Sequence, residues 1–107
     1  MANSIIAQRG KRMSKDVKFI GELTTIYKLS TDDVKAIQDL AREVEKRPED
    51  DQEGGLDLLK KVIRAGSEGG EELTDEDFGG FPMEELSLLS GEIMKFSGIG
   101  ADQGNDN

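Results

Sequence analysis

The side chains of this chain that could act as acids, bases or metal ligands are almost all carboxylates and lysines. The 107 residues contain 23 Asp and Glu and one Tyr, but no His and no Cys. Histidine is the commonest general base and transition-metal ligand, and cysteine supplies thiolate sites. An enzyme built from this composition would therefore depend on cooperating carboxylates or on lysines.

Two pairs of adjacent carboxylates, Asp32–Asp33 and Glu84–Glu85, lack the spacing that such cooperation requires. Neighbouring residues on a helix point about 100° apart, so their side chains do not face one substrate. Each pair falls in the first turn of an expected helix, where the helix dipole favours negative charge. The hydroxyls of Ser87 and Ser90 have no base nearby in the sequence. We therefore assign no catalytic residue.

Two acidic, glycine-containing stretches, EDDQEGG and DEDFGG, invite comparison with calcium-binding loops. An EF-hand loop has Gly at position six and a bidentate Glu at position twelve. With Gly54 at position six of the first stretch, position twelve is Lys60. Counted from Asp75, position twelve of the second stretch is Leu86. Both stretches lack the decisive ligand, so we expect no metal site and no cofactor.

Charge and hydropathy limit the partners. The net charge is −9, and residues 66–107 contain eleven Asp and Glu against Lys95 alone. Nucleic-acid binding requires clustered Lys and Arg, so we do not expect nucleic acid as the main partner. No apolar run approaches the roughly 20 residues that cross a bilayer, and residues 1–13 lack a signal-peptide pattern. We expect a cytoplasmic protein that does not bind membranes.

Length and hydrophobic periodicity predict a small, mostly α-helical bundle forming a single domain. Residues 1–13 are predicted to be a flexible basic arm, residues 14–99 the helical domain, and residues 100–107 a disordered polar tail. Only 35% of the residues are hydrophobic, whereas 35% are charged, so the core must be modest.

The clearest predicted helix follows Ser30. The sequence Ser-Thr-Asp-Asp resembles a capping box, an apolar face runs from Val34 to Val44, and Pro48 ends the helix. A shorter helix is expected over residues 56–65.

Two further elements are predicted towards the C-terminal end. Thr74 can cap a brief turn over residues 75–78. A Leu/Met-rich helix should span residues 82–97, with Pro82 in its first turn and Gly98 as a left-handed cap.

Residues 14–29 fit two structures. Their β-branched content, and apolar residues at odd positions, fit a hairpin that turns near Gly21. Apolar residues at helical spacing, with Ser14 as an N-cap, fit a helix instead. We favour the helix and keep a short hairpin near residues 16–29 as the alternative.

The predicted helix over residues 82–97 carries apolar side chains on more than one face. Such a helix needs cover beyond a single seam. Either the rest of the domain covers it, with methionines filling gaps, or a partner protein does. Under the second interpretation the partner-binding residues are Phe81, Met83, Leu86, Leu88, Leu89, Ile93, Met94 and Phe96.

The segment LTDEDFGGFPMEELSLLSGEIMKFSGI, preceded by the capped helix and the Leu-rich middle helix, resembles the tail assembly chaperones of long-tailed bacteriophages. Those proteins are small, acidic and mostly helical, and their last helix often ends in an Ile/Met–x–x–Ser-Gly pattern. The basic arm over residues 1–13 departs from this resemblance. The resemblance implies a non-enzymatic protein of the host cytoplasm. Its partners would be the tape measure protein, which it keeps soluble, and the tail tube protein, which it recruits.

Two alternative functions fit the composition. One is a small acidic phage inhibitor or nucleic-acid mimic, although most acids here lie in Gly-rich loops rather than on one ordered face. The other is a head–tail connector of the virion. Self-association as a homo-oligomer is left open.

We predict that stability does not depend on calcium. Both acidic stretches lack the closing Glu, so thermal melts with excess calcium and with a chelator should superimpose. A calcium-induced rise of more than a few degrees would contradict this prediction.

Overall fold

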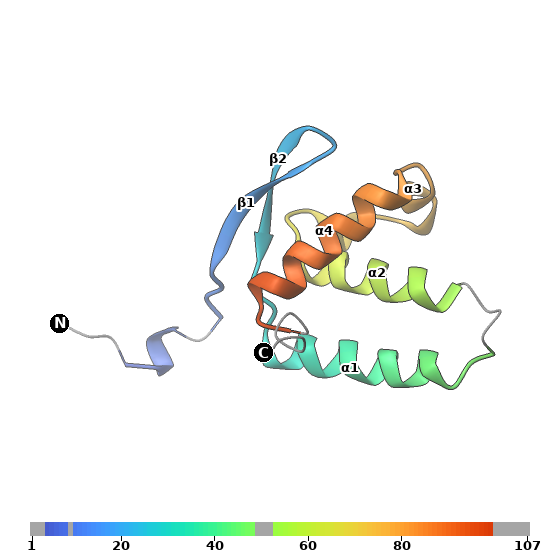
Figure 1. Cartoon of the computed structure of the whole chain (residues 1–107). Coiled ribbons are helices and arrows are strands. Elements are labelled where there is room, and N and C mark those ends of the chain that lie inside the picture. Colours follow the sequence, from blue (N-terminus) through green and yellow to red (C-terminus); the bar gives the residue numbers. More distant parts are fainter. Residues whose placement is uncertain (1–3, 9, 49–52, 100–107) are drawn as a thin grey trace, which may run out of the picture.

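The computed structural model describes residues 4–8, 10–48 and 53–99, which form a mostly α-helical fold with one β-hairpin (Figure 1). The fold class is the one that the sequence predicts. The first half of the EDDQEGG stretch and the predicted tail over residues 100–107 lie outside the described residues. The elements are η1 (Ile6–Gln8), β1 (Ser14–Phe19), β2 (Glu22–Tyr27), α1 (Thr31–Glu45), α2 (Glu53–Gly66), η2 (Gly70–Glu72), α3 (Asp75–Gly79) and α4 (Met83–Phe96).

The helix favoured for residues 14–29 is wrong, because β1 and β2 form an antiparallel hairpin. Its register runs from Ser14 opposite Tyr27 to Phe19 opposite Glu22. The two turn residues, Ile20 and Gly21, have φ angles of 53° and 80°. Positive φ at both positions is the geometry of the two-residue turns that match strand twist. The β-branched content and the left-handed glycine thus outweigh the helical spacing.

Helix α1 forms as predicted. The Ser30 hydroxyl accepts from the Asp33 N–H at 3.1 Å, and the Asp33 carboxylate accepts from the Ser30 N–H at 3.3 Å, which completes the capping box. Helix α2 begins at Glu53, three residues before the predicted start. A Cβ on Gly54 would lie 2.6 Å from Val44 Cγ1. Close packing on α1 therefore extends α2 through two glycines that local propensity disfavours.

The capping signals at the C-terminal end are confirmed. Thr74 and Asp77 form a second capping box at α3. Gly98 has a φ of 78°, and the N–H of Ile99 donates to the Met94 carbonyl at 2.8 Å, as in a Schellman motif. Pro82 is the N-cap of α4 rather than its first helical residue.

Helix α2 is the centre of the fold. It packs against α1 on one side and against α4 on the other, and the chain that follows it joins the hairpin (Figure 1). The N–H of Glu68 donates to the Thr25 carbonyl at 2.9 Å, next to a bridge between Ile26 and Ser67. The buried core consists of Ile26, Ile37, Val62, Ile63, Phe78, Leu86, Leu89 and Ile93.

The contact between α2 and α4 is closest at Gly66. A Cβ at this position would lie 2.4 Å from Ile93 Cγ2 and 3.2 Å from Leu29 Cδ2. Ile93 is fully buried. Only a residue without a side chain lets α4 and the chain before α1 approach α2 this closely.

We predict that Gly66→Ala destabilises the protein. Overpacking a tight contact costs about 1–3 kcal/mol, which outweighs the gain in helix propensity of roughly 1 kcal/mol. The matched control is Gly91→Ala on α4, where an added Cβ meets no atom within 4 Å. This control should stabilise the protein slightly. Urea melts of both variants test the prediction, and equal effects of the two substitutions would contradict it.

Candidate functional site

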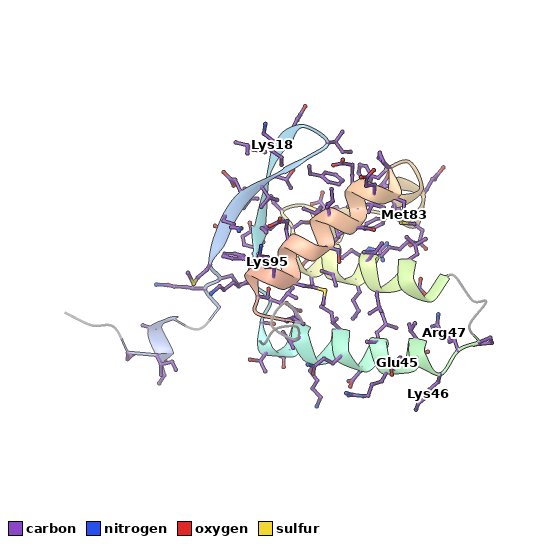
Figure 2. All side chains as sticks on the ribbon, viewed as in Figure 1. Lys18, Glu45, Lys46, Arg47, Met83 and Lys95 are labelled. Carbon is purple, nitrogen blue, oxygen red and sulfur yellow. The ribbon has the colours of Figure 1, made fainter. Side chains whose placement is uncertain are left out.

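The structure divides the eight partner-binding residues predicted from the sequence into three groups. Leu86, Leu89 and Ile93 are buried in the core, whereas Phe81, Met94 and Phe96 are half-buried and pack against it. Met83 and Leu88 are exposed, at 53% and 59% of their surface. Figure 2 places Met83 at the start of α4 and Lys95 near its end.

Helical geometry explains this division. Leu86, Leu89 and Ile93 recur at three- and four-residue spacing and form the face of α4 towards the core. Leu88 falls on the opposite, solvent-facing side. Phe96 is covered differently, since the ammonium groups of Lys15 and Lys28 lie 5.2 and 5.5 Å from its ring centroid. Of the predicted set, Met83 and Leu88 are therefore the residues that α4 most exposes to a partner.

The hairpin turn adds an exposed apolar residue, bonded to α4, that the sequence did not assign to a site. Ile20 is 47% exposed, and its N–H donates to the Glu85 carboxylate at 3.1 Å. Glu85 and Leu88 are three positions apart, so they are neighbours on the helix surface. Ile20 and Leu88 thus lie on adjoining parts of the molecule. We call these two residues, with Glu85 between them, the tip surface.

The sequence contained a signal for Ile20 that the helical interpretation concealed. Placing Gly21 in a two-residue turn puts Ile20 in that turn, where its side chain points to solvent rather than into an apolar stripe. The same register puts Leu23 opposite Lys18, on the hairpin face away from Val17 and Phe19. Leu23 is accordingly 69% exposed.

Backbone strain marks the same residue. Among the residues that the structure describes, Ile20 is the one residue other than glycine with a positive φ, which is 53°. A β-branched side chain rarely adopts this conformation, which costs about 1–2 kcal/mol for an L-residue. Asn or Gly would fit the turn with less strain. Strained residues cluster at functional sites, so the strain and exposure of Ile20 indicate a role in binding.

Acidic side chains surround the tip surface. Glu22 follows the turn, Glu84 lies one helical turn before Leu88, and Glu92 lies one turn after it. The nearest bases along these elements are Lys18 and Lys95. The arrangement is an apolar centre with a mostly negative rim, so it suits a partner that is apolar and basic.

A separate surface, a groove, runs between α1 and α2. The groove has a volume of about 520 Å³ and an apolar floor of Ala36, Ile37 and Leu40. Asp75 at its rim accepts from Arg64 Nη2 at 3.1 Å and from Lys60 Nζ at 3.3 Å. The Arg64 guanidinium, together with the Lys60 ammonium, holds the pKa of the Asp75 carboxyl below its usual range. These three charged groups form ion pairs with one another, so their role is structural.

Several of the carboxylates considered for chemistry have structural partners as well. Asp33 and Asp77 complete capping boxes, and Glu85 holds the hairpin turn. The Tyr27 hydroxyl donates to the Glu68 carboxylate, which raises the pKa of Tyr27. Within residues 4–8, 10–48 and 53–99, no three Asp, Glu, His or Cys side chains gather as a metal site would require.

Comparisons with protein-family models, curated proteins and solved structures find no match to this chain. None of the helices in the described part of the chain is long and apolar enough to cross a membrane.

We predict that Asp75 stabilises the fold at neutral pH and that acid removes this contribution. Its pKa is lower in the folded protein than in the unfolded chain, so the stabilisation is present above the unfolded pKa. It disappears as the pH falls through the folded pKa. The melting-temperature difference between the native protein and Asp75→Asn should therefore shrink from neutral to acidic pH.

The control for this titration is Glu76→Gln, which removes one charge from the same first turn of α3. Among the described residues Glu76 has no ion-pair partner. A pH-dependent difference of the same size for Glu76→Gln would show that the ion pairs of Asp75 are not the cause.

Proposed function

We propose that this protein is a non-enzymatic assembly chaperone that binds an apolar, basic helical segment of a client protein at the tip surface. The observation that carries the proposal is that two exposed apolar side chains, Ile20 and Leu88, lie on elements joined by the hydrogen bond from the Ile20 N–H to Glu85, with carboxylates flanking them in the sequence. Hydrophobic side chains in such a setting form a small patch that a partner helix can cover reversibly.

The resemblance of residues 73–99 to the tail assembly chaperones of long-tailed phages suggests the client. It would be the tape measure protein, and the complex would then recruit tail tube subunits. A long, helix-rich client aggregates through its apolar faces before the tail polymerises. A net charge of −9 on the chaperone would keep the complex dispersed.

The burial of several α4 residues restricts which of them can contact a client. Buried residues such as Leu86 and Ile93 shape the helix but do not reach a client. Leu88 contacts the client directly, and Met83 contacts it only if the client wraps around the start of α4. A helical client segment would lay residues at positions i, i+3, i+4 and i+7 over the tip surface, with Lys or Arg towards the acidic rim.

The experiment uses a variant that removes the apolar surface without loosening the fold. In Ile20→Asn with Leu88→Gln, Asn tolerates the left-handed turn and Gln is accommodated on an exposed helix face. This double variant should be as stable as the native protein. Each substitution should weaken client binding by about 1 kcal/mol or more, so that the double variant loses at least roughly tenfold in affinity.

The readout is the soluble fraction of the tape measure protein on co-expression, beside a thermal melt of each variant. Ile6→Gln is the matched control, because Ile6 is an exposed apolar residue on the arm, away from α4. Leu86→Ala is the fold control and should lower stability by roughly 2–5 kcal/mol. If the double variant keeps the client as soluble as the native protein does, the tip surface is not the binding site.

A further inference from the structure

The outer edge of β1 is a second surface that could bind a strand. The sheet has two strands, and within the described residues β1 pairs with β2 alone. Figure 1 shows β1 on the outer side of the hairpin, away from α1 and α2. The N–H of Lys28 donates to the Met13 carbonyl at 2.9 Å, which fixes the alternation of bonded and non-bonded pairs. By that alternation, Ser14, Asp16 and Lys18 direct their backbone groups away from β2.

The side chains along this edge carry charges of both signs. Asp16 and Lys18 lie on the outer face of the hairpin, because both are exposed and alternate with Val17 and Phe19, which pack against the core. Thr25 Oγ1 donates to Asp16 Oδ1 at 2.8 Å and holds the carboxylate on that face. Neither Asp16 nor Lys18 forms an ion pair with another residue in the described ranges. Figure 2 shows Lys18 on the hairpin, beyond the helices.

We propose that β1 pairs antiparallel with β1 of a second copy of this chain, so that two hairpins form one four-stranded sheet. A two-fold axis perpendicular to the sheet keeps the outer face of each hairpin on the same side. Backbone hydrogen bonds form between the two copies only in registers that place the residues whose backbone groups point away from β2 (Ser14, Asp16 and Lys18) opposite one another. The inference does not rest on the proposed function, because it uses a different surface.

Charge selects one register among those that the backbone allows. Pairing Asp16 with Asp16 of the partner, or Lys18 with Lys18, places like charges opposite each other, which is unfavourable. A two-fold axis at Lys15 also brings like charges together, because it places the two Lys15 residues opposite each other. Centring it at Val17 places each Asp16 opposite Lys18 of the other copy and the two valines opposite each other. This register forms two ion pairs and places no like charges opposite one another.

Charged residues on an edge strand usually prevent edge-to-edge pairing. Here the two charges, Asp16 and Lys18, are two residues apart and of opposite sign. They disfavour the registers that place like charges opposite each other and favour the register centred at Val17. The paired edge is short, since the turn at Ile20 ends it. We expect a weak, reversible dimer of the small-interface class, with a dissociation constant in the micromolar range or above.

The first test measures molar mass by light scattering and analytical ultracentrifugation over a wide range of protein concentrations. The full-length native chain should move from monomer to dimer as its concentration rises. Lys18→Asp places carboxylates opposite each other and should weaken the dimer about tenfold or more. Exchanging the two charges, with Asp16→Lys and Lys18→Asp together, should restore it. Lys35→Asp on α1 makes the same charge change elsewhere and should leave the dimer intact.

The second test reads the register directly. The chain has no cysteine, so a single introduced thiol is unique. In the proposed register the two Val17 residues form a non-hydrogen-bonded pair with Cα atoms about 4.5 Å apart, which is within disulfide range. Val17→Cys should form a disulfide-linked dimer under mild oxidation, whereas Lys15→Cys should not.

Three results would overturn the proposal. One is a native chain that stays monomeric at every concentration. Another is a dimer that Lys18→Asp does not weaken. The third is cross-linking of Lys15→Cys in preference to Val17→Cys. Val17 is partly buried, so the folding of Val17→Cys is checked by a thermal melt. If this variant does not fold, the charge-exchange variants test the proposal by themselves.

Discussion

The close approach of α4 to α2 at Gly66 is the constraint on which the other features of the structure depend. Ile93 occupies the space that any side chain at Gly66 would need, and Leu29 packs against the same point. The Ser97 hydroxyl, one turn after Ile93, accepts from the Leu29 N–H at 2.8 Å. The end of α2, the end of α4 and the chain that leads into α1 therefore meet at one place. This junction fixes the direction in which α4 crosses the molecule.

Once that direction is fixed, the other face of α4 is available to solvent and to the hairpin. Phe19 and Phe81 pack edge to face with centroids 5.3 Å apart, which joins the end of β1 to the loop before α4. The Glu85 carboxylate adds a hydrogen bond to the turn. These contacts hold Ile20, in an unfavourable backbone conformation, against the first half of α4. Packing in the core thus determines which apolar groups remain outside.

The hairpin has two exposed features that could serve two partners. Its turn, with Leu88 of α4, forms the apolar tip surface, and the outer edge of β1 offers unpaired backbone groups. A chaperone that self-associates through one and binds a client through the other would present two tip surfaces to a long client. Two linked contacts raise the overall affinity by raising the effective concentration of the second contact. Under the proposed function, weak individual contacts would still allow release of the client.

Local signals in the sequence determined much of the helical part of the fold. The capping residues Ser30 and Thr74 and the left-handed cap at Gly98 act within a few residues, so their roles follow from the sequence directly. The sequence likewise placed apolar side chains on more than one face of the last helix, although it did not show whether a core or a partner covers them. The absence of His and Cys restricted the available chemistry through composition alone.

The tertiary structure decided what local patterns left open. Residues 14–29 fit both helical and strand spacing, and the hairpin pairing, with its contacts to Ser67 and Glu68, selects the strands. Gly54 is helical because α1 packs against it, contrary to its propensity. Which of the apolar residues of α4 reach solvent depends on the position of α2, and Ile20 becomes exposed only through the turn. Burial is a property of neighbours that are distant in sequence, so these outcomes required the folded chain.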